Sequence, residues 1–186
     1  FSPTRSSDIL SGLVGSDICI RDSIHTDKKI IVYNHRPHTY KNWPWVLKQM
    51  DKLWEERQDF ELWVPLADTN EREYMTNDKY DRFGYFSKLS SCYIGISCKQ
   101  RYGGWAISST DGMSVGVPYM FSDDDYYHEL ADSAGIYYKD EDEFIERLQN
   151  AIWPNTDSEA FIALLDEGGK ECLEMRYGQR QETCLH

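Results

Sequence analysis

Short apolar runs alternate with longer amphipathic segments along most of this chain. Residues 30–33 read Ile-Ile-Val-Tyr, which has the length and the β-branched composition of a buried strand. The apolar residues of the next segment recur at helical spacing: Val46, Met50, Leu53 and Trp54. This spacing predicts a helix with one apolar face. Asn42 or Trp43 is suited to its cap, and Pro44 falls in the first turn, where the missing N–H costs little.

The same alternation continues to about residue 152. Further strands are predicted at 60–64, 92–97, 117–121 and 135–138, and further helices at 83–91, 124–132 and 140–152. Residues 105–115 are predicted to form a loop that runs into a short helix. Residues 68–81 are predicted to form a polar loop, and residues 158–177 are predicted to be helical. Strands that alternate with helices at this spacing indicate an α/β, Rossmann-like fold, in which a doubly wound and mostly parallel sheet carries helices on both faces.

Composition and charge limit the class of protein. The chain has 186 residues, 40% of them hydrophobic, and no apolar run long enough for a transmembrane segment. The formal net charge of -12 argues against a surface for duplex nucleic acid, which needs clustered Lys and Arg. The five cysteines are scattered and include no CxxC pair, which is typical of reduced packing residues and predicts a cytoplasmic protein. The sequence shows no metal cluster.

The loop after the first predicted strand, residues 34–41, is a candidate binding site. In doubly wound sheets ligands bind outside the carboxyl ends of the strands. Arg36 and Lys41 lie just beyond a strand and just before a helix, where two cations could converge on a diphosphate. The alternative is an ordinary polar loop. His35 and His38 flank Arg36, and such loop histidines are expected to face solvent.

A second candidate loop, residues 99–118, follows the strand predicted at 92–97. Gly103 and Gly104 allow a backbone to approach a ligand closely. Three hydroxyl residues then stand where they could cap a helix or hold phosphate oxygens: Ser108, Ser109 and Thr110. Asp111 could accept hydrogen bonds from a ribose diol, or it could simply complement the dipole of the helix.

Residues 104–118 resemble the signature of retaining glycosyltransferases with the GT-B fold. In that signature an aromatic-Gly-Ile-Ser stretch leads into Glu-Ala-Met-Ala-Cys-Gly-Thr-Pro. The matching letters here are Trp-Ala-Ile-Ser at 105–108 and Asp-Gly-Met-Ser-Val-Gly-Val-Pro at 111–118. Arg36 and Lys41 also have the spacing of the family's Gly-Arg…Lys-Gly phosphate loop. The resemblance extends over about residues 30–177.

The resemblance implies that the chain is one half of a two-domain enzyme. In such enzymes the carboxyl-terminal Rossmann-like domain binds a nucleotide-diphosphate sugar, and the amino-terminal one binds the acceptor. Residues 29–156 are similar to the donor-binding domain. By the same resemblance, residues 1–28 would come from the interdomain region, and the tail 157–186 would pack toward the missing N-terminal domain. The isolated chain is then expected to transfer nothing.

The resemblance also assigns roles to individual residues. Arg36 and Lys41 would be catalytic, because they would neutralise the departing diphosphate. Six positions of the second loop would bind the donor substrate: Gly104, Trp105, Ser108, Ser109, Thr110 and Asp111. Within this set the backbone of Ser109 and Thr110 would hold the diphosphate and Asp111 the ribose. The family needs no metal ion for this chemistry, so no cofactor is expected.

Two departures from the family pattern keep other functions open. The family has two glutamates with seven residues between them, and here the first position is Gly103 and the second the shorter Asp111. The sugar, the base and the choice between retention and inversion therefore stay open. A non-catalytic, degenerate interaction module is the main alternative. A sugar-nucleotide epimerase of similar architecture is another.

Overall fold

A single six-stranded parallel sheet organises the chain. The structure, a computed structural model, describes residues 28–102 and 106–153. The strands are β1 (Lys29–Val32), β2 (Phe60–Trp63), β3 (Met75–Thr76), β4 (Ile94–Ser97), β5 (Tyr119–Ser122) and β6 (Gly135–Tyr138), in the order β3-β2-β1-β4-β5-β6. The predicted N-terminal segment before Lys28, the predicted tail 157–186, and both Gly104 and Trp105 lie outside the described residues.

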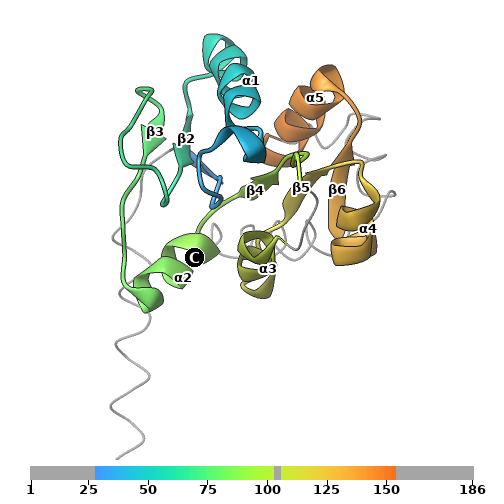
Figure 1. Ribbon diagram of the computed structural model, residues 1–186. Coiled ribbons are helices and arrows are strands. Elements are labelled where there is room, and N and C mark those ends of the chain that lie inside the picture. Colours follow the sequence, from blue (N-terminus) through green and yellow to red (C-terminus); the bar gives the residue numbers. More distant parts are fainter. Residues whose placement is uncertain (1–27, 103–105, 154–186) are drawn as a thin grey trace, which may run out of the picture.

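Helices cover both faces of this sheet. They are α1 (Trp43–Glu56), α2 (Arg82–Ser90), α3 (Ile107–Ser114), α4 (Asp125–Ala131) and α5 (Glu141–Ile152). Figure 1 shows α1 and α5 on one face and α2, α3 and α4 on the other. Two short 3-10 turns, η2 (Thr39–Lys41) and η3 (Asp132–Ala134), precede α1 and β6. The predicted doubly wound, Rossmann-like fold is confirmed.

The local sequence signals explain where most elements begin. Helix α1 follows Asn42, which has the left-handed φ of 60°, and Pro44 falls in its first turn. Helix α5 is capped by the Asp140 carboxylate, which accepts from the N–H groups of Asp142 and Glu143. Strand β6 has the predicted bounds, and the ends of the other predicted strands differ from the observed ones by at most two residues.

One prediction about the sheet is wrong. Within the predicted polar loop 68–81, Met75 and Thr76 form the edge strand β3, which pairs in parallel with Leu62 and Trp63 of β2. Tyr74 and Met75 are buried there, although charged residues precede them. A two-residue edge strand has no periodicity of its own, so its existence depends on the neighbouring strand.

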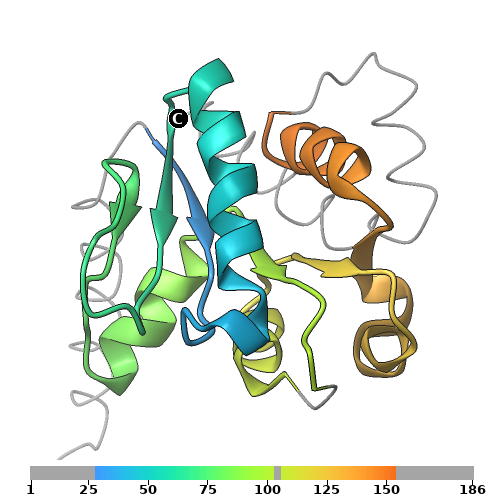
Figure 2. The same ribbon diagram turned by 45° about the horizontal axis from the view of Figure 1, so that its top comes forward.

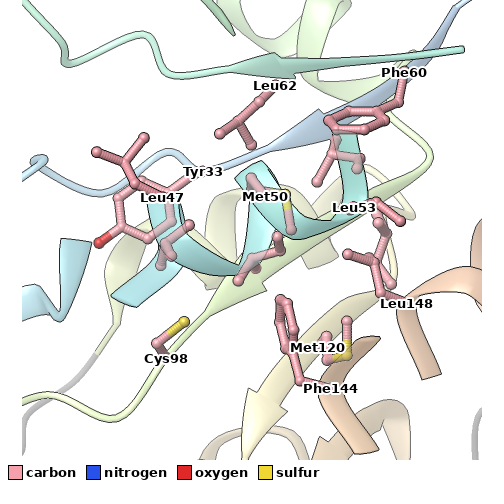
Figure 3. Packing of buried hydrophobic residues seen from close by; sticks show 14 of the residues in the cluster. Tyr33, Leu47, Met50, Leu53, Phe60, Leu62, Cys98, Met120, Phe144 and Leu148 are labelled. Atoms are coloured by element: carbon pink, nitrogen blue, oxygen red, sulfur yellow. The ribbon is translucent and has the colours of Figure 1, made fainter. Parts of the chain in front are cut away.

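The core consists of two apolar layers, one on each face of the sheet. Side chains of β1 alternate between them, with Ile31 in the layer under α1 and α5 and Val32 in the layer over the other helices. Figure 3 shows the first layer, in which Met50 and Leu53 of α1 lie near strand residues and Leu148 of α5. Because both faces are covered, the strands read as continuous apolar runs rather than alternating ones.

Tyr119 of β5 fills the space that two glycines leave beside the sheet. A Cβ atom on Gly95 of β4 would lie 2.2 Å from the Tyr119 Cζ, and one on Gly112 of α3 would lie 2.2 Å from its Cε2. The ring is fully buried, and its hydroxyl donates to the Asn34 Oδ1 at 2.9 Å. The absence of a side chain at both glycines therefore lets α3 and β4 close around this tyrosine.

We expect Gly112→Ala to lower the free energy of unfolding by about 1–3 kcal/mol, because the added methyl group overpacks against a buried ring. Urea denaturation measures this change. Thr110→Ala, at an exposed position of the same helix, is the control and should change stability by less than about 0.5 kcal/mol. Equal stability of the two variants would contradict this account of Gly112.

Candidate functional site

The sheet has a topological switch point between β1 and β4. These strands are neighbours and parallel, but the chain leaves β1 toward β2 on one side and leaves β4 toward β5 on the other. Figure 2 shows the segment after β1 passing into α1 near the segment that follows β4. Loops that diverge at this edge open a crevice where ligands bind in this fold class. Both candidate loops predicted from the sequence lie here.

Asn34 joins the loop after β1 to the start of α3. Its Nδ2 donates to the Ser108 carbonyl at 2.7 Å and to the Tyr85 hydroxyl at 3.0 Å, while its Oδ1 accepts from Tyr119. Asn34 is 2% exposed, so these bonds satisfy an amide that has little access to water. Asn34, two residues before Arg36, therefore fixes the first turn of α3 against the loop that follows β1.

A buried polar chain lies beside this junction. The Tyr127 hydroxyl donates its one hydrogen to the Cys98 carbonyl at 2.9 Å, so the Ser97 Oγ at 2.8 Å must donate to it. Ser97 then accepts from the Nε2–H of His35 at 2.9 Å, which defines the tautomer of that imidazole. Gln100 donates its Nε2–H to the Tyr127 oxygen at 3.1 Å.

His35 is a buried neutral histidine, contrary to the prediction that it faces solvent. It is 4% exposed, because its ring packs against Tyr33 and reaches Ser97 across the sheet. Burial, and secondly the charge of Lys41, lower the pKa of His35 to about 4. His38 is exposed as predicted and accepts the N–H of Tyr40 at the start of η2.

The two predicted cations have different environments. The Arg36 side chain is exposed and makes no hydrogen bond or ion pair with the residues that the structure describes. Lys41 is half-buried, and its ammonium donates to the Gln100 Oε1. Desolvation lowers the pKa of Lys41. The Arg101 N–H donates to the Tyr40 carbonyl at 3.0 Å, so the two loops lie side by side along this stretch.

The start of α3 differs from the expectation for its backbone. The N–H groups of Ser109 and Thr110 both donate to the Ala106 carbonyl, at 2.9 and 3.2 Å, and so are not open to a phosphate. The two preceding helical residues, Ile107 and Ser108, have no carbonyl within the helix to accept their N–H groups. The Ser109 side chain is fully buried and its Oγ has no hydrogen-bond partner among the described residues.

Asp111 faces a different neighbour from the two cations. Its carboxyl is half-buried, and burial raises its pKa while the charge of Arg82 of α2 opposes that shift. The same carboxylate contributes to the raised pKa of Tyr85, also on α2. Asp111 therefore lies close enough to α2 to interact electrostatically with Arg82 and Tyr85. The loop that bears Arg36 and Lys41 is joined to the start of α3 at the switch point through Asn34.

The sequence pattern missed the residues that support Lys41. Gln100 lies in the second candidate loop, but nothing local indicates that it is buried and bonded to Lys41. Tyr127 comes from α4, far along the chain, so no spacing rule relates it to His35. Within residues 28–102 and 106–153 no group of three or more His, Cys, Asp or Glu could hold a metal, and no helix there is long and apolar enough to cross a membrane.

Comparisons with known proteins connect this architecture to glycosyltransferases. No protein-family model and no curated protein sequence matches the chain. Among solved structures, the α,α-trehalose-phosphate synthase (UDP-forming) from Burkholderia vietnamiensis is similar over 94% of this chain and 49% of its own, with a TM-score of 0.57 and 9% identity. WaaG, a glycosyltransferase involved in lipopolysaccharide biosynthesis, matches 82% of this chain and 45% of its own, with a TM-score of 0.57 and 14% identity.

The described chain has the fold of one GT-B glycosyltransferase domain. It spans about half the length of these structures. The GT-B-like fold also matches the N-terminal domain of Candida albicans trehalose-6-phosphate phosphatase, with a TM-score of 0.60 and 11% identity over 88% of this chain and 42% of that one. Identities this low show a shared fold, and function has to be argued from the site.

Acid should destabilise the protein partly through His35. Burial lowers the pKa of His35 from the ordinary 6.5 to about 4 in the folded protein. The unfolded chain therefore takes up the proton first, and the free energy of unfolding, unaffected by His35 above about pH 6.5, falls by up to about 3 kcal/mol as the pH drops toward 4. His35→Gln should show a shallower loss of unfolding free energy over this interval in urea titrations. Parallel pH profiles of the two proteins would contradict a buried neutral His35.

Proposed function

We propose that the chain is the donor-binding half of a GT-B glycosyltransferase, which binds a nucleotide-diphosphate sugar for hexosyl transfer to an acceptor held by a second domain. The observation that carries the proposal is the junction at the switch point, where the segment bearing Arg36 and Lys41 is tied to the first turn of α3. A mobile polar loop would not need the buried Asn34 and Gln100 contacts.

The proposed chemistry concentrates positive charge where the leaving group departs. As the bond between the sugar carbon and the diphosphate oxygen breaks, the diphosphate takes the electron pair. The acceptor hydroxyl oxygen forms the new bond to that carbon, and its proton passes to the departing diphosphate. Arg36 would bind the diphosphate directly and Lys41 would add a second cation, with the N–H groups of Ile107 and Ser108 behind it. With these groups, divalent metal is expected to be dispensable.

Lys41 suits this role because of its environment. Its half-buried ammonium interacts with less screening than an exposed one, and one of its three donors is taken by Gln100. The body of the protein carries a formal net charge of -12, so these cations would form a local positive focus. Ribose binding by Asp111 and donor-substrate binding by Gly104, Trp105 and Ser108 remain part of the proposal, as does a cytoplasmic location.

A non-catalytic module of the same fold is the second candidate. Gly103 supplies no carboxylate where the family has its first glutamate, and Asp111 lies near Arg82 of α2. This alternative predicts no nucleotide affinity, whereas the donor-binding proposal predicts affinity without transfer by the isolated chain.

We expect UDP, GDP or ADP, alone or as the sugar conjugate, to raise the melting temperature of the chain. Arg36→Ala and Lys41→Ala should each weaken this binding about tenfold or more, since each removes a charge-assisted hydrogen bond. Lys52→Ala is the matched control, because Lys52 is an exposed lysine of α1 paired with Glu141. Unchanged melting with all three nucleotides and their sugars would refute donor binding.

Gln100 should act on nucleotide affinity through Lys41. Gln100→Ala is expected to weaken binding about three- to tenfold, and to cause no further loss in the Lys41→Ala background, because the two residues share one interaction. Calorimetric titration of the four proteins of this double-mutant cycle measures the coupling. Additive losses would contradict it, and Gln149→Ala, a glutamine of α5 bonded to Glu56, serves as control.

A further inference from the structure

A pocket opens beside the candidate donor site. It has a volume of about 370 Å³ and lies between the first turn of α1, the segment after β5 and the end of β6. Trp45 and Tyr138 line it, with their rings stacked at a centroid distance of 5.6 Å and an angle of 7°. Figure 1 shows α1 and α5, which bound it, on the same face of the sheet. Its volume falls within the range of small-ligand sites.

Trp45 differs from the other tryptophans of the described chain. The other four donate the indole N–H to a protein oxygen: Trp43 to Glu71, Trp54 to Glu73, Trp63 to Asp78 and Trp153 to Asp59. Trp45 has no such acceptor among residues 28–102 and 106–153, although its side chain is half-buried. Indole N–H groups in such positions ordinarily find a partner, and a ligand of the pocket that Trp45 lines is a candidate for it.

Two further polar side chains that line the pocket have no hydrogen-bond or ion-pair partner among the described residues. The Asn42 side chain makes no capping hydrogen bond to α1 and none to any other described residue. The Lys139 ammonium has no partner within the described part of the chain. Together with the indole, these groups supply three kinds of donor and one amide acceptor beside the stacked rings of Trp45 and Tyr138.

The carboxylates of the pocket select against charged ligands. Asp123, Asp124, Asp140 and Glu141 outnumber Lys99 and Lys139, so an anion meets net negative charge. A cation finds each carboxylate already engaged: Asp124 by Lys99 at 2.9 Å, Asp123 by His128 at 2.6 Å, Glu141 by Lys48 and Lys52, and Asp140 by two N–H groups of α5. Their remaining lone pairs can still accept from hydroxyl groups.

We propose that this pocket binds a neutral saccharide. A pyranose ring has an apolar face that packs on aromatic carbon, and a rim of hydroxyls that both donate and accept, which matches an indole donor, an amide and engaged carboxylates. The site is distinct from the diphosphate site, although Asn42 and Lys99 directly adjoin Lys41 and Gln100 in the chain. The proposal does not depend on nucleotide binding.

The test uses the whole chain and follows the indole N–H resonances by NMR during titration with maltose. We expect the Trp45 resonance to shift and the Trp54 resonance to stay. Trp45→Phe keeps an aromatic ring against Tyr138 but removes the donor, and should weaken maltose binding about three- to tenfold. Trp54→Phe is the matched control on the same helix and should leave the affinity unchanged, because its indole is bonded to Glu73.

Parallel titrations with glucose 6-phosphate, spermidine and magnesium separate the alternatives. Weaker binding of all three than of maltose supports a neutral saccharide site. No maltose-dependent shift at Trp45, tighter binding of any charged probe there, or equal losses in the two variants would overturn the proposal. Asn42→Gly removes a half-buried amide that has no hydrogen-bond partner among the described residues, and glycine keeps the left-handed φ of 60° without strain, so it provides a second variant if Trp45→Phe proves unstable.

Discussion

Tyr119 connects the packing of the sheet to the geometry of the candidate site. Its ring occupies the space left by Gly95 and Gly112, and its hydroxyl, at the far end of that ring, holds the Asn34 amide. Asn34 in turn fixes Ser108 at the start of α3. One buried aromatic side chain therefore helps to position both the first candidate loop and α3. Its ring is rigid and closely packed, so its hydroxyl is held in one place for Asn34.

At the switch point a buried polar chain lies beside an exposed cation. The chain consists of three uncharged side chains that are hydrogen-bonded in series: His35, Ser97 and Tyr127. Gln100 links this chain to the Lys41 ammonium, while the Arg36 side chain is exposed. Such an arrangement orients the Lys41 ammonium in advance and leaves the Arg36 guanidinium accessible from solvent. Orienting one of the two charges in advance reduces the entropic cost of binding an anion.

The elements with strong local signals could be predicted from the sequence. Helix α1 has an apolar stripe over several turns, and Met50 and Leu53 are buried as that stripe requires. Residues with weak local signals could not. Met75 and Thr76 form a strand only because β2 presents an unpaired edge, and His35 is buried only because Ser97 lies opposite it on β4.

The sequence by itself determined the order of the strands and helices apart from β3, and with it the doubly wound sheet that brings residues 34–41 to the edge shared with α3, since periodicity and chain direction are local properties. It also placed Arg36 and Lys41 in one loop. Only the tertiary structure decided which groups surround them. The tertiary structure brings Gln100 and Tyr127 to the site, sets Asp111 near Arg82 of α2, and leaves the Trp45 indole without an acceptor among the described residues. All three depend on contacts between distant segments, which local spacing does not reveal.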